Sequence, residues 1–259
     1  RDVLGSRGLG DVYKRQEGFR IEVKKSSLST NDDVKKLAEQ GAPAWSAVIA
    51  EEQSRGRGRY ERSFYSPAQN GLYMSVLLRP QLAANETLFI TTCAAVAVAE
   101  AVEALCGKYA EIKWVNDVYL QGKKVSGILT EASFNVESGG LDYAVVGIGV
   151  NVRGSFPAEL GNIAVSMFGE GQCLPQIRSR LAAEVLLRLR DYCEHIKERT
   201  FYAEYKRRSF LIGKRVCVLN SGCSRGAEVV GLDENCFLTV RYDDGSFAKL
   251  VAGEVSIKV

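Results

Sequence analysis

The sequence predicts an α+β protein, in which a β-sheet with flanking helices is followed by a small β-rich unit at the C-terminus. Between Ser46 and Val152, segments of strand length recur with apolar residues at alternating or consecutive positions. The stretch Leu88–Leu105 has a broad apolar face at helical spacing, which predicts a long helix packed on that sheet. From Lys214 onward, short β-branched segments alternate with Gly, Asn and Asp turns and predict a small β-barrel.

Length and composition limit the possible classes of protein. With 259 residues, 46% of them hydrophobic, the chain can form one large domain, or one large domain with a small satellite. Its 34 basic and 31 acidic residues leave a net charge of only +3, which excludes a histone-like or disordered polyelectrolyte. The longest apolar runs, such as Cys93–Ala99, fall far short of the roughly 20 residues of a membrane-spanning helix, so we expect a soluble protein.

Cysteine and histidine usage excludes several kinds of site. The seven cysteines are odd in number and include no C-x-x-C pair, which argues against a disulfide framework and predicts a reducing, cytoplasmic location. His195 is the single histidine, so a His-based metal site or a Ser–His–Asp triad is hard to assemble, and we predict no metal-ligating residues. Residues 222–226 match the G-x-S-x-G pattern of a nucleophile elbow. Both flanks are typical of strands and no histidine follows, so a hairpin loop is predicted instead.

The first predicted element is a helix over 31–40. Residues 1–16 show neither an apolar segment nor any periodicity, so we interpret them as a disordered or non-native leader and exclude them from the fold. Thr30 and Asp33 then resemble a capping box, with Asp in place of the usual Glu, and apolar residues follow at helical spacing.

A polar loop separates the next two predicted strands, 46–50 and 72–78, the second of which ends at Pro80. This loop, 51–67, is rich in arginine and too long for a tight turn, which makes it a candidate functional loop. The same periodicities predict the later elements, and the continuous apolar run at the last strand is typical of a fully buried one. The further strands are 111–114, 118–120, 125–131 and 143–152, and the further helices are 176–194 and 199–209.

The loop combines Arg55, Arg57, Arg59 and Arg62 with two glycines, Gly56 and Gly58. Glycine lets the backbone approach a ligand closely, and arginine offers a planar fork for a carboxylate or a phosphate. A solvated surface loop could have the same composition, so the string alone leaves both interpretations open.

Two further strings complete the set of motifs. Lys113-Trp114-Val115-Asn116-Asp117 lies between two predicted strands and is followed by Lys124 and Gly127. Such groups on neighbouring strand ends suit a triphosphate with Mg²⁺, although an ordinary polar hairpin would look alike. Gly147-Ile148-Gly149-Val150-Asn151 ends the buried strand, and a bulge or tight helix packing is the structural alternative for its glycines.

Taken in order, these motifs resemble those of the biotin protein ligase family over about residues 20–259. The matching strings are Ser29-Thr30-Asn31, Glu52-Gln53 with Gly56-Arg57-Gly58-Arg59, Ser66-Pro67, Gly71-Leu72-Tyr73-x-Ser75, Lys113-Trp114-x-Asn116-Asp117, Lys124-x-x-Gly127-Ile128-Leu129-x-Glu131, Gly147-x-Gly149-x-Asn151 and Gly253-Glu254-Val255. The sequence departs from the family pattern at Glu61, Phe64 and Val115, where Gly, Trp and Pro are usual. Phe64 still offers an apolar face for adenine.

The resemblance implies a mixed sheet with flanking helices, the lipoate/biotin ligase fold, in a catalytic domain over 17–211, and an SH3-like barrel over 212–259. It implies that biotin and Mg²⁺-ATP react to biotinyl-5′-AMP, and that a lysine of a biotin carboxyl carrier protein then accepts the biotin. Fewer than thirty residues precede Ser29, so we expect the monofunctional type without the N-terminal DNA-binding domain. We also expect no partner DNA or membrane, and either a monomer or a homodimer.

By motif position, the resemblance assigns a role to each group of residues. Ser29, Thr30 and Gln53 are expected to form hydrogen bonds with the ureido ring. The biotin tail and the adenylate are expected to be wrapped by Arg57, Gly58 and Arg59. Lys124 is expected to bind the biotin carboxylate and the α-phosphate, and Arg62 the outgoing phosphates. Asn116 and Asn151 are expected to contact the nucleotide, and Asp117 to orient Lys124 or Mg²⁺. Lys124, Arg59 and Asp117 form the expected catalytic set, and Asn31, Gly56, Lys113 and Gly127 complete the binding set.

Two other functions compete with this hypothesis. A lipoate or octanoyl ligase of the same superfamily would favour an apolar slot over the polar set at Ser29, Thr30 and Gln53. A non-enzymatic basic binding module would explain the arginines, but it would explain neither Lys124 with Asp117 nor the Gly-x-Gly-x-Asn strand.

Overall fold

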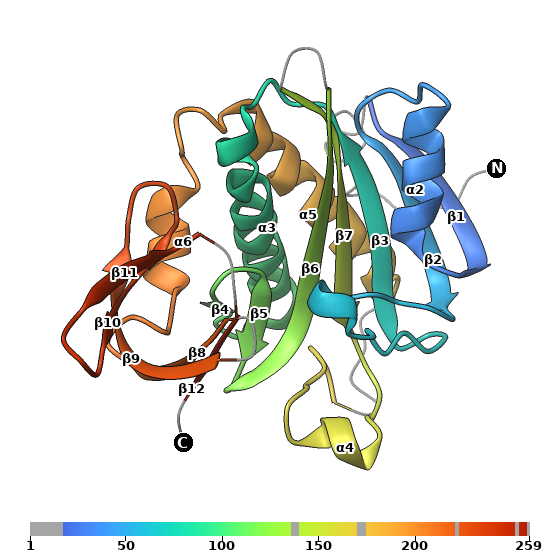
Figure 1. Cartoon of the computed structure of the whole chain (residues 1–259). Helices are drawn as coiled ribbons and strands as arrows, with labels where there is room; N and C mark the ends of the chain where they lie inside the picture. Colours follow the sequence, from blue (N-terminus) through green and yellow to red (C-terminus); the bar gives the residue numbers. More distant parts are fainter. Residues whose placement is uncertain (1–17, 136–139, 170–174, 221–222, 252–253, 258–259) are drawn as a thin grey trace.

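The computed structural model describes residues 18–135, 140–169, 175–220, 223–251 and 254–257 (Figure 1). The predicted leader lies outside the described residues, as do Gly222 and Gly253. The described chain contains two β-sheets, with helices packed against the larger one. This arrangement confirms the predicted α+β class.

The larger sheet has seven strands in the order β1-β2-β3-β7-β6-β5-β4. Strands β1 and β2 are parallel and the other neighbours are antiparallel, so the sheet is mixed, as expected. The strands are β1 Arg20–Ser27, β2 Ser46–Gln53, β3 Gly71–Leu78, β4 Glu111–Lys113, β5 Asp117–Leu120, β6 Lys123–Phe134 and β7 Leu141–Asn151.

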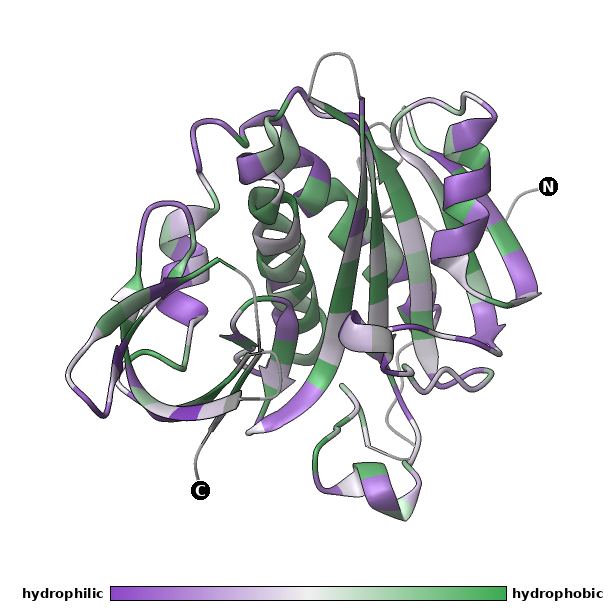
Figure 2. Cartoon of the chain, in the orientation of Figure 1, coloured by the Kyte–Doolittle hydropathy of each residue, from purple (hydrophilic) through white to green (hydrophobic). Residues whose placement is uncertain are grey.

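Helices cover both faces of this sheet. Successive side chains of a strand point to opposite faces, so apolar side chains on each face pack against a helix. Val48, Leu77 and Val145 form a small core with Val34 and Ala38 of α2 (Thr30–Glu39). The alternate residues belong to the main core on the other face, where α3 (Leu88–Cys106) and α5 (Ile177–Glu194) pack. Figure 2 shows the apolar character of α3 and the hydrophilic outer side of α2. The two short helices are α4 (Ala158–Gly161) and α6 (Tyr202–Arg208).

Helix α3 is the predicted core helix. By length and composition, Ala84–Cys106 is apolar enough to cross a membrane, but 67% of its most apolar window is buried inside the protein. Every residue from Phe89 to Ala99 is buried. A helix that is apolar all round is typical of the interior of a large domain, and Gly107 ends it in the left-handed conformation at φ 69°.

The C-terminal part forms a second sheet of five antiparallel strands in the order β11-β10-β9-β8-β12. Within the described residues, β11 and β12 are its open edges, so the strands of the predicted SH3-like barrel are present but closure into a barrel is not confirmed. The sheet is tied to the larger one, since Trp114 Nε1 donates a hydrogen bond to the Cys236 carbonyl at 2.9 Å. The strands are β8 Arg215–Asn220, β9 Cys223–Leu232, β10 Leu238–Tyr242, β11 Phe247–Leu250 and β12 Glu254–Ile257.

Strand β1 is the main element that the sequence did not predict. Seven of its eight residues are exposed or half-buried, because it lies at the edge of the sheet with few side chains in the core. The apolar side chains that would mark a strand are themselves in solvent: Ile21 is 46% exposed and Val23 is 69% exposed. Phe19, Ile21 and Val23 do alternate with polar residues, so the sequence carries a strand signal for β1, but a short one that ends at Lys24.

Replacing Arg208 by alanine is expected to lower the free energy of unfolding by about 2 kcal/mol, since hydrogen bonds to charged groups contribute roughly 1.5–3 kcal/mol. The guanidinium of Arg208 is 4% exposed and bonds Glu204 and Glu103 at 2.6 Å and the Ala110 carbonyl at 2.8 Å. Arg207 also bonds Glu204, but its side chain is 55% exposed, so Arg207→Ala is a matched control with no expected change. Urea unfolding compares the two variants, and equal midpoints would contradict this account of α6.

Candidate active site

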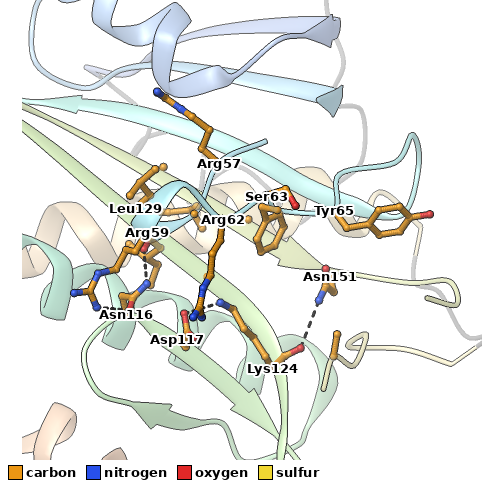
Figure 3. A pocket seen from close by; sticks show the side chains of 18 of the residues that line it. Arg57, Arg59, Arg62, Ser63, Tyr65, Asn116, Asp117, Lys124, Leu129 and Asn151 are labelled. Atoms are coloured by element: carbon orange, nitrogen blue, oxygen red, sulfur yellow. Dashed lines mark hydrogen bonds and ion pairs between the residues drawn. The ribbon is translucent and has the colours of Figure 1, made fainter. Parts of the chain in front are cut away.

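A cavity of about 490 Å³ is lined by β5, β6, β7, the N-terminus of α2 and the loop after β2 (Figure 3). Its volume is in the range of small-molecule and cofactor sites. It brings together every predicted site residue except Gly56: Ser29, Thr30, Asn31, Gln53, Arg57, Gly58, Arg59, Arg62, Lys113, Asn116, Asp117, Lys124, Gly127 and Asn151.

The arginine-rich loop folds back on itself as an irregular hairpin above this cavity. Backbone hydrogen bonds join Phe64 N to the Gly56 carbonyl at 2.8 Å and Gly58 N to the Arg62 carbonyl at 2.6 Å. Gly56 is buried at the base of this hairpin, where a Cβ atom would lie 2.5 Å from the Phe64 carbonyl oxygen. Its part is therefore to let the two arms of the loop approach, which explains why it does not line the cavity.

Two glycines of β7 leave room for side chains that lie across the strand. A Cβ atom on Gly147 would lie 2.1 Å from Oδ1 of Asn31, and one on Gly149 would lie 2.5 Å from the ring of Phe64. Both glycines pair in regular register with β3 and β6, so a bulge is wrong for them. The other structural alternative, tight helix packing, agrees with the contact of Gly147, because Asn31 belongs to α2. The Phe64 ring thus lies against Gly149 on the floor of the cavity, where it offers an apolar surface.

A connected set of polar side chains closes one end of the cavity. Gln53 Oε1 accepts the backbone N–H of Thr30 at 2.9 Å, and Gln53 Nε2 donates to Ser66 Oγ at 3.1 Å. Thr30 Oγ1 lies 2.7 Å from Ser75 Oγ, and Ser75 Oγ donates to Asn31 Oδ1 at 2.6 Å. This end is neutral and rich in hydrogen-bonding groups, which suits an uncharged polar ring rather than an ion.

Glu131 anchors this network and also holds the loop. Its carboxylate accepts hydrogen bonds from Asn31 Nδ2 at 2.7 Å and Lys35 Nζ at 2.5 Å, and it lies 3.2 Å from Arg57 Nη2. Burial alone would raise the pKa of Glu131, but these hydrogen bonds and charges outweigh it and hold the pKa below its usual value. Glu131 therefore stays ionised at neutral pH.

Arg57 lines the cavity and also links the loop to neighbouring elements. Its guanidinium bonds Asp32 at 2.6 Å as well as Glu131, and its side chain is 39% exposed. Figure 3 shows it extended toward α2, away from Lys124 and Arg62. Arg57 thus fastens the loop to α2 and β6, and its contact with the biotin tail and adenylate stays a prediction.

The other end of the cavity is cationic. Lys124 Nζ pairs with Asp117 at 2.7 Å, and Arg59 Nη1 donates to Asn116 Oδ1 at 3.2 Å. Arg62 points toward Asp117 and Lys124 (Figure 3). The lining cation Arg57 is paired with Asp32 and Glu131 at the opposite end. Among the other described lining residues, Asp117 is the one carboxylate against four cations, Arg59, Arg62, Lys113 and Lys124. Such a surplus of positive charge favours an anionic group, such as a phosphate or a carboxylate.

The cavity also has an apolar wall, to which the sequence motifs assigned no role. It is formed by Phe156, Leu160, Ile163, Ala164 and Val255. The segment before Val165 lies beside β6, because Lys124 N bonds the Ile163 carbonyl and Val165 N bonds the Lys124 carbonyl, both at 2.9 Å. No periodicity in the sequence marks this segment. Val255 belongs to β12, so the second sheet also contributes to the cavity.

The two rejected motifs lie away from this cavity. His195 is exposed, and its Nδ1 contacts only the Asp191 carbonyl of its own helix end. Cys223–Gly226 is part of strand β9, which pairs with β8 as a hairpin, so these residues of the predicted hairpin loop are strand, not loop. Among the described residues, no group of three His, Cys, Asp or Glu side chains could hold a metal ion.

Comparison with known proteins agrees with this geometry. The model of the biotin/lipoate A/B protein ligase family matches residues 23–151. The biotin–[acetyl-CoA-carboxylase] ligase of Mycobacterium tuberculosis is 31% identical over 242 residues, which are 90% of this chain and 86% of that protein. The chain belongs to the biotin/lipoate A/B protein ligase family. The sequence resemblance is thus confirmed at the level of the family.

Other family members extend this comparison. The bifunctional ligase/repressor BirA of Bacillus spizizenii is 38% identical over 175 residues, 64% of this chain, and the chain spans about half of that relative, 53%. The solved structure of biotin protein ligase from Aquifex aeolicus in complex with biotin and ATP has a TM-score of 0.76 at 29% identity. It covers 92% of this chain and 98% of that one. The family fold therefore extends well beyond residues 23–151.

Proposed function

We propose that this chain is an ATP-dependent biotin–protein ligase, which joins biotin to a lysine of a biotin carboxyl carrier protein through biotinyl-5′-AMP. One observation carries the proposal: a single cavity has a neutral hydrogen-bonding end at Thr30 and Gln53 and a cationic end at Arg62 and Lys124. Biotin has an uncharged ureido ring at one end and a carboxylate at the other, so it matches both. The Aquifex aeolicus complex with biotin and ATP supports the assignment.

The first step would need positive charge at the cationic end. A carboxylate oxygen of biotin attacks the α-phosphorus of ATP, the bond to the leaving pyrophosphate breaks, and biotinyl-AMP forms. Negative charge grows on the phosphate oxygens in the transition state, and fixed cations that meet it lower the barrier. Lys124, oriented by Asp117, would serve the reacting phosphate, and Arg62 the outgoing pyrophosphate. Asn116 and Asn151 would contact the nucleotide above the Phe64 floor.

In the second step a carrier lysine amine attacks the acyl carbon of the adenylate. The acyl–oxygen bond breaks, AMP leaves, the amine loses a proton and an amide bond forms. Mg²⁺ would enter as the partner of ATP. Among the lining residues that the structure describes, Asp117 is the one carboxylate, and magnesium commonly binds one or two carboxylates together with substrate phosphates. The residues therefore fit a magnesium ion carried by the nucleotide and not a separate metal site.

The wider organisation belongs to the same proposal. Residues 17–211 would form the catalytic domain, and 212–259 an SH3-like barrel whose Val255 closes the cavity. A cytoplasmic location fits the free thiols at Cys93, Cys106, Cys193, Cys217 and Cys236. The protein would act as a monomer or a homodimer.

A carrier assay separates the candidate functions. The protein is incubated with Mg²⁺-ATP and biotin plus a purified biotin carboxyl carrier domain, or with octanoate or lipoate plus a lipoyl domain. Mass spectrometry is expected to show one biotin on the first carrier and no change on the second. Acylation of the lipoyl domain alone would assign the chain to the lipoate branch, and no acylation of either would favour a binding module.

Arg59→Gly is expected to speed dissociation of biotinyl-AMP about tenfold, equivalent to roughly 1.4 kcal/mol. Arg59 bonds Asn116 and stacks on the ring of Tyr60 at 5.0 Å, so it links the loop to the nucleotide end of the cavity. Glycine removes these contacts and frees the backbone. Released adenylate should then label bystander lysines, which a biotin blot of added serum albumin detects. Equal, negligible labelling by both proteins would show that Arg59 is an ordinary loop residue.

A further inference from the structure

Behind Thr30 lies a chain of hydrogen bonds through Ser75, Asn31 and Glu131. Ser75 is fully buried on β3, Asn31 is 4% exposed at the start of α2, and Glu131 lies on β6. Ser75 and Glu131 are not among the residues that line the cavity. Proton positions along this chain follow from the chemistry of the groups.

An ionised carboxylate can only accept hydrogen bonds, so Glu131 requires the amide nitrogen of Asn31, at 2.7 Å, to face it. The amide oxygen of Asn31 then faces Ser75 Oγ at 2.6 Å, and this oxygen also can only accept. The single hydroxyl proton of Ser75 is therefore committed to Asn31.

The hydroxyl group of Thr30 must consequently donate its proton to another group of the protein. Its hydroxyl lies 2.7 Å from Ser75 Oγ and 3.1 Å from Gln53 Oε1. The proton of Ser75 is already used, so the shorter contact needs the proton of Thr30, and Gln53 Oε1 has the backbone N–H of Thr30 as its donor. With either partner, the one hydroxyl proton of Thr30 is unavailable to a ligand.

We propose that Glu131, acting through Asn31 and Ser75, is a positioning residue that makes Thr30 a hydrogen-bond acceptor and so selects ligands with an N–H donor at this point. The inference rests on the proposed function for its ligand. A cyclic urea carries two N–H groups, whereas a dithiolane ring or an alkyl chain carries none. This chain of hydrogen bonds from Glu131 to Thr30, the relay, thus supplies a physical reason for choosing biotin over lipoate or octanoate, because an acceptor left without a donor loses a buried hydrogen bond.

The test uses the two biotin analogues in which one ureido N–H is replaced by a ring oxygen, with calorimetric dissociation constants for each. Wild-type protein is expected to bind one of them much more weakly than biotin, since ring oxygen and Thr30 would both be acceptors. In Ser75→Ala, Thr30 can turn and donate, so this preference for biotin should fall about tenfold. Glu131→Gln should act in the same direction, because its neutral amide allows Asn31 to flip.

Ser126→Ala is the matched control. Ser126 is a fully buried serine on β6 whose hydroxyl has no hydrogen-bond partner among the described residues, so its loss should leave the preference unchanged. General loosening of the site would weaken biotin and analogue alike and would not move the ratio. If Ser75→Ala fails to fold, the ratio of biotin affinity to analogue affinity in Glu131→Gln tests the relay alone. An unchanged preference in both folded variants would overturn the relay.

Hydrogen exchange separates failure of the relay from failure of the proposed function. In ligand-free protein, NMR should find the side-chain amide of Asn31 slow to exchange, and at least tenfold faster in Glu131→Gln. Fast exchange in the wild type would refute the relay whatever the ligand is. Slow exchange in a protein that does not bind biotin would support the relay and refute the biotin assignment.

Discussion

Lys124→Ala is expected to slow formation of biotinyl-AMP roughly 10²–10³-fold while the affinity for biotin changes only a few-fold, since losing a donor to developing charge has an effect of this size. Lys124 lies against Gly127, where a Cβ atom would be 3.0 Å from its Nζ, and its ammonium pairs with Asp117 at 2.7 Å. These contacts fix the ammonium before the reaction. Its attraction for the phosphate therefore grows as charge develops in the transition state.

Single-turnover adenylation and calorimetry separate the two quantities. Lys249→Ala is the matched control, because Lys249 also pairs with an aspartate, Asp233, at 2.9 Å but lies on the second sheet and does not line the cavity. Wild-type adenylation by Lys124→Ala would require a different cation for the phosphate, and loss of biotin binding without slower chemistry would place Lys124 in ground-state recognition.

Gly147→Ala is expected to weaken biotin binding by roughly 100-fold, or about 2.7 kcal/mol. The added methyl group would lie 2.1 Å from Oδ1 of Asn31, closer than any real contact allows. The Asn31 side chain is held at both ends, by Ser75 and by Glu131, so it can move only by breaking these bonds. Overpacking of this kind typically costs about 1–3 kcal/mol.

The control is Gly231→Ala, since Gly231 also lies in a strand but nothing lies within 4 Å of the position of its Cβ. Calorimetric titration with biotin compares the two variants. Gly231→Ala is expected to bind biotin as tightly as the wild type. If Gly147→Ala also bound biotin as tightly as the wild type, Asn31 would be free to move.

Periodicity predicted the interior of the fold well and its margins poorly. The core strand β3 and helix α3 were predicted to within one residue, because both are buried along most of their length. Strand β1 was missed because its apolar alternation stops at Val23 and the rest of the strand is polar. The closure of the C-terminal strands depends on long-range pairing that no local pattern encodes. Short helix α4 has no apolar face long enough to detect.

For the site, the motifs predicted which residues meet but not how they pair. Gly-x-Gly-x-Asn at the end of β7 was one of the motifs, but the side chains of Asn31 and Phe64, which fill the space over its glycines, were not predicted. The partners of Arg57 could not be predicted, because Asp32 and Glu131 are 25 and 74 residues away in the sequence. The same holds for Ser75, whose hydroxyl orients Thr30 across 45 residues.

Biotin-dependent exchange of labelled pyrophosphate into ATP tests the central claim most directly, because it reports adenylate formation without any carrier protein. With Mg²⁺-ATP, exchange is expected to appear with biotin and to stay at background with lipoate, with octanoate or with no acid, and Lys124→Ala should show it roughly 10²–10³-fold more slowly. Background exchange with biotin in folded wild-type protein, or equal exchange with lipoate, would contradict the assignment of this cavity to biotin and ATP.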